Sequence, residues 1–391
     1  MSRKQHIAWV LTVLMSALYI LVGNRIATRN YIMRDDLANG VAEKMKVVKV
    51  LDTEYEHTLF GEDAEIRGEN IILFEGKFLN GYKKGQVVRA VQRVDNMYAV
   101  EMRPVKEGGT IIVYANPDPE IDVKYMFAEH YRVTVLWVLV GVFALLMLLF
   151  GRGKGLNALI SLVFTIGSIF LVFLPAVLAD GNIYVWSLVT CAYIIFMTLL
   201  IVSGWTRKSL GAIIGCAGGT AISGILVVFC DMFLHTSGLV NEDAMYLMML
   251  EPDNPIDIKA IIFAAIIIGA VGAVMDVAMD ISSSLAELKS QVPHISRAQL
   301  IKSGFTIGRD IMGTMSNTLI LAYIGSSLST TLLLVAYNSS ALLLFNTEMI
   351  VVELLQTIAG SFGILLSIPL TSIVCGVLFA DGGSEKTTYK G

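Results

Sequence analysis

Apolar stretches about as long as a membrane-spanning helix recur along almost the whole chain. A helix crosses a hydrocarbon core of about 30 Å with roughly 20 apolar residues. Only 16% of the residues are charged, whereas soluble domains have about 25%. The sequence therefore predicts an α-helical polytopic membrane protein with about eight transmembrane helices. The stretches lie at 7–22, 132–150, 156–179, 183–203, 210–234, 258–284, 313–337 and 356–380.

Lys and Arg residues between these stretches predict the orientation in the membrane. Short cytoplasmic loops are enriched in Lys and Arg, and here basic loops alternate without exception with loops that have neither residue. Both termini are therefore expected in the cytoplasm of a multi-pass plasma-membrane protein. The basic loops are 151–155, 205–208 and 289–309, and the loops without Lys or Arg are 180–182, 235–257 and 338–355.

The N-terminus has two interpretations. Arg3 and Lys4 precede the first apolar stretch, which is also the pattern of a secretory signal peptide. The following residues include Asn24 and Arg25 and offer no small-x-small cleavage site. We expect an uncleaved first transmembrane helix at 1–23, with a cleaved signal peptide as the alternative.

After a polar linker at 24–44, the segment 45–128 has the composition of a soluble domain. Short runs rich in β-branched residues are separated by glycines, which predicts a small all-β domain of about five strands. An OB-like barrel or a small sandwich fits this length, and the loop alternation makes the domain extracytoplasmic. A seven-helix membrane domain at 131–380 and a cytoplasmic tail at 381–391 complete the chain.

Small residues at helical spacing predict close helix packing. Gly211, Gly215 and Gly219 are four residues apart, as are Gly269 and Ala273. Such stripes allow helix backbones to approach each other, and we favour this reading over a gating hinge. The segment 341–355 is too short and too acidic for a span, and predicts an interfacial helix.

Two polar stripes interrupt the apolar pattern between 258 and 328. Asp276, Asp280, Ser283 or Ser284, and Glu287 share one helical face, opposite Val277, Ile281 and Leu285. Three glycines beside the second stripe predict a bent or broken helix there. The second stripe comprises Ser303, Thr306, Asp310, Thr314 and Asn317, with Arg309 beside it and the glycines at Gly304, Gly308 and Gly313.

Ionisable residues within spans cost roughly 2.5–3.5 kcal/mol each on insertion scales, so a function or a partner is expected for them. Carboxylates, hydroxyls and a carboxamide suit a hard cation or a proton relay; the sequence does not indicate which ion. The equally weighted alternative is a structural ion-pair cluster in which an Asp pairs with Arg309 or Lys302 near the inner interface. The candidate ion- or substrate-binding residues are Asp276, Asp280, Ser283, Glu287, Arg309, Asp310, Thr314 and Asn317.

Several other functions are disfavoured. An intramembrane aspartyl hydrolase could use Asp276 and Asp310, but Gly308-Arg-Asp310 lacks the Gly-x-Gly-Asp pattern of such enzymes. No phosphate-binding Gly-x-x-x-x-Gly-Lys-[Ser/Thr] motif is present, and no basic face with interleaved aromatic residues indicates nucleic-acid binding. The four cysteines lie in apolar stretches without metal-site spacing. We expect neither an enzyme nor a bound cofactor.

Two long motifs resemble the YibE/F-like family of bacterial multi-span membrane proteins. They run from Gly269 to Glu287 and from Ser303 to Tyr323, and Arg132 with Gly153-Lys-Gly155-Leu is a weaker match. The resemblance implies a plasma-membrane protein, found largely in Gram-positive bacteria. The family has no settled biochemical activity and supplies no assigned functional residues.

The favoured hypothesis is a secondary transporter or permease with an ion or proton site in the polar stripes. The alternative is a membrane scaffold or sensor whose outer β domain binds an envelope partner. The expected partners are the lipid bilayer and a small ion or small molecule. Protein partners left open are a second copy of the chain or an envelope protein.

Overall fold

The computed structural model describes residues 3–29, 42–58, 67–95, 103–116, 123–240, 242–249, 255–337 and 340–380. The chain divides into two compact units, Ile32–Leu146 and the combination of Met1–Tyr31 with Met147–Gly391. Most of the predicted linker 24–44 and the whole predicted tail 381–391 lie outside the described residues.

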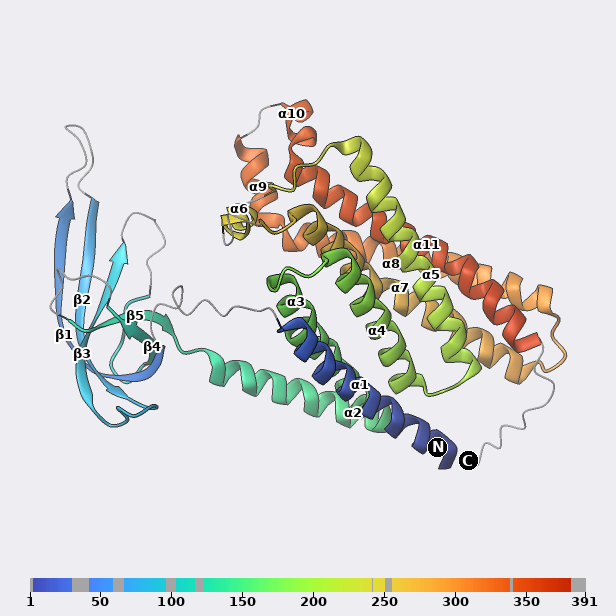
Figure 1. Ribbon diagram of the computed structural model, residues 1–391, viewed down its shortest axis with the longest axis horizontal. Helices are drawn as coiled ribbons and strands as arrows, with labels where there is room; N and C mark the ends of the chain where they lie inside the picture. Colours follow the sequence, from blue (N-terminus) through green and yellow to red (C-terminus); the bar gives the residue numbers. More distant parts are fainter. Residues whose placement is uncertain are drawn as a thin grey trace. The chain divides into compact units, whose positions relative to one another are not determined.

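The first unit contains a closed five-stranded barrel with the strand order β1-β2-β3-β5-β4 (Figure 1). Side chains alternate along β1, so that Met45 and Val47 are buried in the barrel while Lys46 is exposed. The small all-β domain of about five strands predicted from the sequence is confirmed, and it is a barrel rather than a sandwich. The strands are β1 (Glu43–Thr58), β2 (Arg67–Phe78), β3 (Val87–Asp95), β4 (Thr110–Ala115) and β5 (Tyr125–His130).

The other unit is helical. Among the described residues, six helices are long and apolar enough to cross a membrane, and the bent pair α8 and α9 would make a seventh. The protein is therefore a membrane protein. The helices are α1 (Arg3–Ala27), α2 (Val133–Ser168), the π-helix η1 (Ile169–Phe173), α3 (Leu174–Leu178), α4 (Ile183–Ser203), α5 (Arg207–Leu234), α6 (Glu242–Met249), α7 (Ile258–Gln291), α8 (Arg297–Ser326), α9 (Leu328–Tyr337), α10 (Ala341–Asn346) and α11 (Glu348–Ala380).

Two breaks divide the longest apolar segments. Arg152 has φ 48° and ψ −127° inside α2, at the position of the predicted loop 151–155. The second break bends the chain by 68° between α8 and α9, within the predicted span 313–337. That span is therefore not one straight helix.

The predicted break at the α8 glycines is wrong, because α8 is one continuous helix from Arg297 to Ser326. Gly304 and Gly308 are buried and face α11 instead. A Cβ at Gly304 would lie 2.8 Å from Ser372 Cβ, and a Cβ at Gly308 would lie 3.1 Å from Ile368 Cγ1. These glycines allow the two helices to approach closely.

Close packing predicted for the α5 glycines is confirmed. A Cβ at Gly215 would lie 2.9 Å from Thr371 Cβ, and one at Gly219 would lie 2.7 Å from the Gly363 carbonyl oxygen. Both contacts are with α11, which lies beside α5 (Figure 1). The interfacial helix predicted at 341–355 is wrong in extent, because α10 ends at Asn346 and α11 begins at Glu348.

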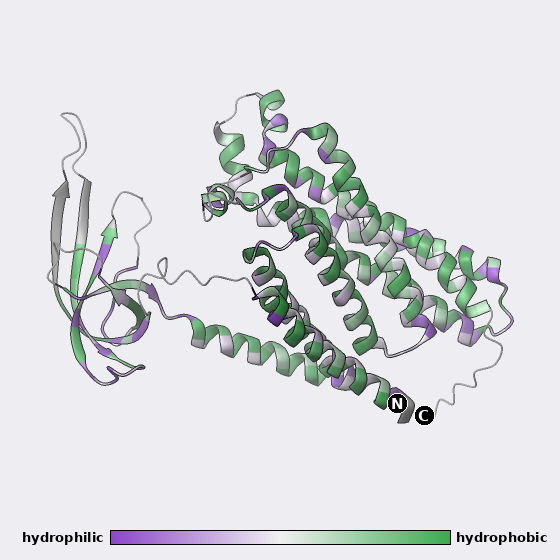
Figure 2. Ribbon diagram, in the orientation of Figure 1, coloured by the Kyte–Doolittle hydropathy of each residue, from purple (hydrophilic) through white to green (hydrophobic). Residues whose placement is uncertain are grey.

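Polar residues lie mainly near the ends of the long helices, and apolar residues cover their middles (Figure 2). One end, called here the basic end, contains the start of α5 with Arg207 and Lys208 and the α7–α8 connection with Lys289. The opposite end, called the acidic end, contains Asp231 and Glu348. Lys259 lies at the acidic end and pairs with Asp231 at 3.7 Å.

Candidate functional site

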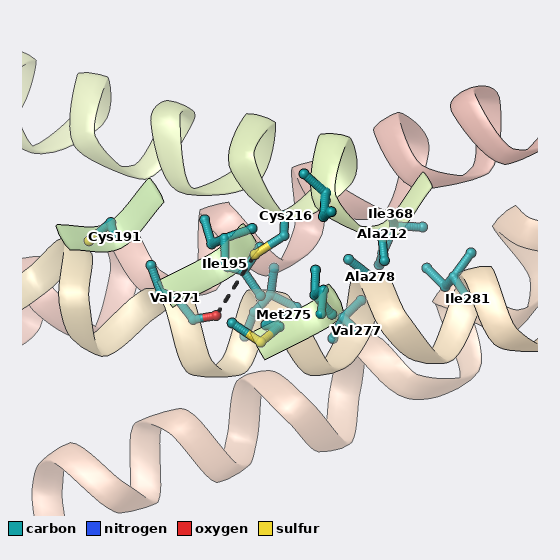
Figure 3. Close-up of a cluster of buried hydrophobic side chains, with 14 of the residues drawn as sticks. Cys191, Ile195, Ala212, Cys216, Val271, Met275, Val277, Ala278, Ile281 and Ile368 are labelled. Atoms are coloured by element: carbon teal, nitrogen blue, oxygen red, sulfur yellow. Dashed lines mark hydrogen bonds between the residues drawn. The ribbon is translucent and has the colours of Figure 1, made fainter. Parts of the chain in front are cut away.

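The predicted polar stripe on α7 faces away from the core of the helical bundle. Asp276 and Asp280 are exposed, whereas Val277 and Ile281 on the other side of the helix are fully buried. Figure 3 shows Val277 and Ile281 among the buried side chains between α7, α5 and their neighbours. The sequence-based assignment of the two faces of α7 is therefore confirmed.

α8 presents a polar face in the same manner. Its four predicted residues Arg309, Asp310, Thr314 and Asn317 are all exposed. Only four of the thirty residues of α8 are buried, so most of this helix borders the outside of the bundle. The buried four are Leu300, Gly304, Gly308 and Leu319.

The register between α7 and α8 places their two polar faces at the same level along the helix axes. A Cβ at Gly304 would lie 3.1 Å from Leu285 Cδ1 near one end, and Gly269 faces the Tyr323 hydroxyl near the other. The two helices are therefore antiparallel. Counting from these contacts at about 1.5 Å per residue, Asp280 is level with Asp310 and Asp276 is level with Thr314.

Contacts with α4 fix the position of the stripe along the bundle. The ring of Tyr184, near the start of α4, lies 5.0 Å from that of Phe263. Ser203, the last residue of α4, donates a hydrogen bond to Met279 Sδ at 3.5 Å. Asp280 is therefore level with the basic end of α4, and Asp276 is about one helical turn deeper. The stripe therefore begins at the basic end.

Hydrogen bonds in the stripe are local to each helix. Gln291 Nε2 donates to Glu287 Oε1 at 3.0 Å, and Thr314 Oγ1 donates to the Ile311 carbonyl at 2.9 Å. Ser283 is half-buried. Neither Asp276 nor Asp280 forms an ion pair within the described part of the chain, and no bond there joins the two predicted sets.

Open space borders both polar faces. A Cβ added at Gly272, one turn from Asp276, or at Gly313, next to Thr314, would meet no atom within 4 Å. Other glycines of α8, such as Gly308, are packed against neighbouring side chains. Gly272 and Gly313 therefore lie on the outer surface of the helical bundle. In the described residues, no three His, Cys, Asp or Glu side chains form a group that could hold a metal ion.

A family model described as YibE/F-like protein matches residues 139–381. The chain belongs to the YibE/F-like family. No curated protein and no solved structure matches the chain. The family segment contains both polar faces, whereas the five strands of the barrel lie outside it.

Sequence reasoning missed polar residues that extend the α8 face towards the acidic end. Tyr323 Oη is buried and lies within reach of the Gln356 side chain of α11. A Cβ at Gly360 of α11 would lie 2.7 Å from Leu319 Cδ2, so Gln356, one turn earlier on α11, comes level with Tyr323. Glu353 is half-buried and lies about one further turn along. The interruption of an apolar run by Glu353 and Gln356 was the available signal.

Proposed function

We propose that this YibE/F-like protein is a secondary transporter of the plasma membrane, in which the polar faces of α7 and α8 conduct a proton or another small cation. The observation that carries the proposal is the presence of Asp276 and Asp280 exposed beside open space on an otherwise apolar helix. Carboxylates on lipid-facing positions would be costly. A hydrated path along the two faces removes that cost.

The path begins at the basic end. Glu287 lies outermost, followed by the level of Asp280 with Asp310 and the level of Asp276 with Thr314. Asn317 continues the polar face deeper into the bundle. Tyr323, Gln356 and Glu353 then lead towards the acidic end, so polar groups occur along most of the height of α8.

The competing structural ion-pair cluster lacks the bonds that it needs. It requires Asp276 or Asp280 to pair with Arg309 or Lys302, and none of these four forms an ion pair in the described part of the chain. An unpaired carboxylate can accept and release a proton or a hydrated cation, whereas a paired one is held by its partner. The proposed activity is transport and involves no enzymatic reaction or bound cofactor.

The proposed topology has eight spans with both termini in the cytoplasm and the barrel outside. The segment Val133–Leu178 contains 46 residues, about 69 Å if it were one straight helix. Twice the thickness of a hydrocarbon core is about 60 Å, so the break at Arg152 divides the segment into two spans. Together with the bent pair α8 and α9, this gives eight. Reporter fusions at the loops 180–182 and 205–208 would test the orientation.

Proteoliposomes test the transport proposal. The purified chain is reconstituted around a pH-sensitive dye, and a potassium diffusion potential drives cation entry. Asp276→Asn with Asp280→Asn is expected to lose most of the proton flux, while Asp180→Asn, at a carboxylate outside the stripe, is expected to keep it. Unchanged flux in a normally folded double variant would exclude a proton path through the stripe. Repeating the assay with a Na⁺-sensitive dye tests Na⁺ as the conducted cation.

A scaffold or sensor remains the second candidate because the barrel lies outside the family segment. Such a domain is suited to binding an envelope protein without any transport. Deleting the barrel would then abolish the cellular phenotype, while the Asp276 and Asp280 variants would keep it. The transport proposal predicts the opposite ranking for the stripe variants.

A further inference from the structure

A row of residues crosses the outer wall of the barrel and ends at the start of α2. Register pairs Val87 with Lys77, Lys77 with Lys46, and Lys46 with Thr110 across β3, β2, β1 and β4. The Tyr131 amide donates a hydrogen bond to the Thr110 carbonyl at 3.0 Å. The row therefore continues to Tyr131, which lies two positions before the start of α2.

Lys46 and Lys77 are both exposed and directly opposite each other on antiparallel strands. Like charges in that arrangement destabilise a sheet. Neither lysine forms an ion pair with any side chain in the described ranges. The fold alone therefore gives no reason for this pair, whereas an anion bound across both ammonium groups would offset their repulsion.

Two further cations extend this face towards the membrane helix. Lys44 Nζ lies 3.6 Å from the centre of the Tyr131 ring. Arg132 follows, with its side chain 68% exposed, and pairs with Glu129 at 3.0 Å. We call the exposed cations Lys46, Lys77 and Arg132, together with the half-buried Lys44, the basic face.

The direct connection of the barrel to α2 determines which anion the basic face meets. α2 begins at Val133, immediately after Arg132, and its first turns are apolar and exposed. A span that begins there holds Arg132 and Tyr131 at the lipid headgroups, where aromatic and basic residues are favoured. Adjacent strands are about 4.8 Å apart, so Lys46 lies about 10 Å from Tyr131. Val87, 53% exposed at the far end of the row, adds an apolar contact suited to the same interface.

We propose that the basic face binds the anionic headgroups of phospholipids around the first turn of α2, and that it thereby holds the barrel against the membrane surface. The required chemistry is a row of phosphodiesters facing a row of ammonium and guanidinium groups. This inference rests on the barrel and on the start of α2, and is independent of the transport proposal.

Lysine acylation of the full-length chain in nanodiscs tests the proposal site by site. Discs of phosphatidylcholine alone are compared with discs that also contain phosphatidylglycerol, and the modified lysines are quantified by mass spectrometry. Lys46 and Lys77 are expected to be protected only when phosphatidylglycerol is present, whereas Lys124, at the opposite end of β5 from Tyr131, is expected to react equally in both. Equal reactivity of Lys46 and Lys77 in the two discs would overturn the proposal. Protection by inorganic phosphate in phosphatidylcholine discs would also overturn it in favour of a free-anion site.

Variants provide the second arm. Lys46→Gln with Lys77→Gln is expected to weaken the preference for phosphatidylglycerol by about 30-fold, because each lysine near an anionic surface contributes about a factor of five. The control pair Arg89→Gln with Lys124→Gln removes the same charge from positions two residues before the paired Val91 and Met126 of β3 and β5, and should keep the preference. Because the Lys46 and Lys77 variant loses the repulsion between the two ammonium groups, its melting temperature should be unchanged or higher. An undiminished lipid preference in the Lys46 and Lys77 variant would contradict the proposal.

Discussion

Ser282 on α7 donates a hydrogen bond from its hydroxyl to the carbonyl oxygen of Lys208 at the start of α5, at 2.7 Å. The bond joins two residues 74 positions apart at the basic end of the bundle. Cys375 of α11 also donates to the Ser282 hydroxyl, at 3.3 Å. This buried junction of three helices fixes the height of Asp280, which lies two residues before Ser282 on α7.

Ser282→Ala is expected to lower the free energy of unfolding by roughly 0.5–1.5 kcal/mol, because it removes a buried hydrogen bond between α7 and α5. Thermal denaturation in detergent measures the effect. Ser284→Ala is the matched control, since Ser284 is exposed on the same helix. Equal melting temperatures for the two variants would show that the junction does not contribute to stability.

Gly215→Ala is expected to destabilise the protein by about 1–3 kcal/mol, because the new methyl group must displace α11. Its Cβ would lie 3.1 Å from the backbone Cα of Thr371, which cannot rotate away. Gly272→Ala should instead preserve or raise stability, since its Cβ would meet no atom within 4 Å and alanine favours the helix by about 1 kcal/mol. Melting temperatures of the two purified variants test the contrast. Equal melting temperatures for the two variants would refute the packing role of Gly215.

The contrast between these glycines explains which features could be predicted. The spacing of Gly211, Gly215 and Gly219 on one face indicated packing, and α11 fills that face. Gly304 and Gly308 have the same spacing, but three glycines in one helix favoured a break because glycine is a poor helix former. Only the position of α11 shows that Gly304 and Gly308 are packing residues. The bend at Ser327 has no proline, so the sequence offered no clear signal for it.

The candidate site was predictable in part for a similar reason. Helical periodicity alone placed Asp276 and Asp280 opposite Val277, because that assignment depends only on one helix. Their depth depends on contacts with α4 and α5, which no local pattern records. The glycines that border open space could not be distinguished from packed ones without knowing which helices are neighbours.

The pH dependence of barrel stability should depend on Lys83. Its Nζ donates hydrogen bonds to Tyr125 Oη at 2.6 Å and Glu43 Oε1 at 2.9 Å. Hydrogen bonds to Tyr125, Glu43 and Tyr82 raise the pKa of Lys83 above its ordinary value. A raised pKa in the folded state means that the stabilisation is complete below the unfolded pKa of about 10.4 and is lost as the pH rises through the folded value.

Hydrogen exchange of the barrel amides across alkaline pH measures this effect in the intact chain. Lys83→Gln should reduce protection near neutral pH and remove this loss of protection at high pH. Lys84→Gln is the control, because Lys84 is exposed and next in sequence. An unaltered alkaline profile in the Lys83 variant would assign the pH dependence to other groups.

Arg152→Gly is expected to stabilise the protein by about 1 kcal/mol, because glycine adopts the positive φ at this position without a steric penalty. Arg152 has φ 48° and ψ −127° at the break in α2. Arg152→Ala removes the same charge but keeps the Cβ, and should give no gain. Thermal melting of the two variants separates the backbone effect from the effect of charge, and equal values would argue against strain at Arg152.

Tyr323→Phe separates a role in transport from a role in packing. The Tyr323 hydroxyl faces Gly269 and is buried within reach of the Gln356 side chain. Tyr323→Phe keeps the ring and its packing, so the free energy of unfolding should change by no more than the roughly 0.5–1.5 kcal/mol of one hydrogen bond. If the polar face of α8 conducts protons towards Gln356 and Glu353, the same variant should slow proton flux, because phenylalanine neither donates nor accepts a proton. Tyr337→Phe, which removes the same hydroxyl from an exposed ring at the end of α9, is the control. Normal flux in a stable Tyr323→Phe protein would end the path before Tyr323 and restrict it to the basic end, whereas reduced flux with unchanged stability would support a path that continues to the acidic end.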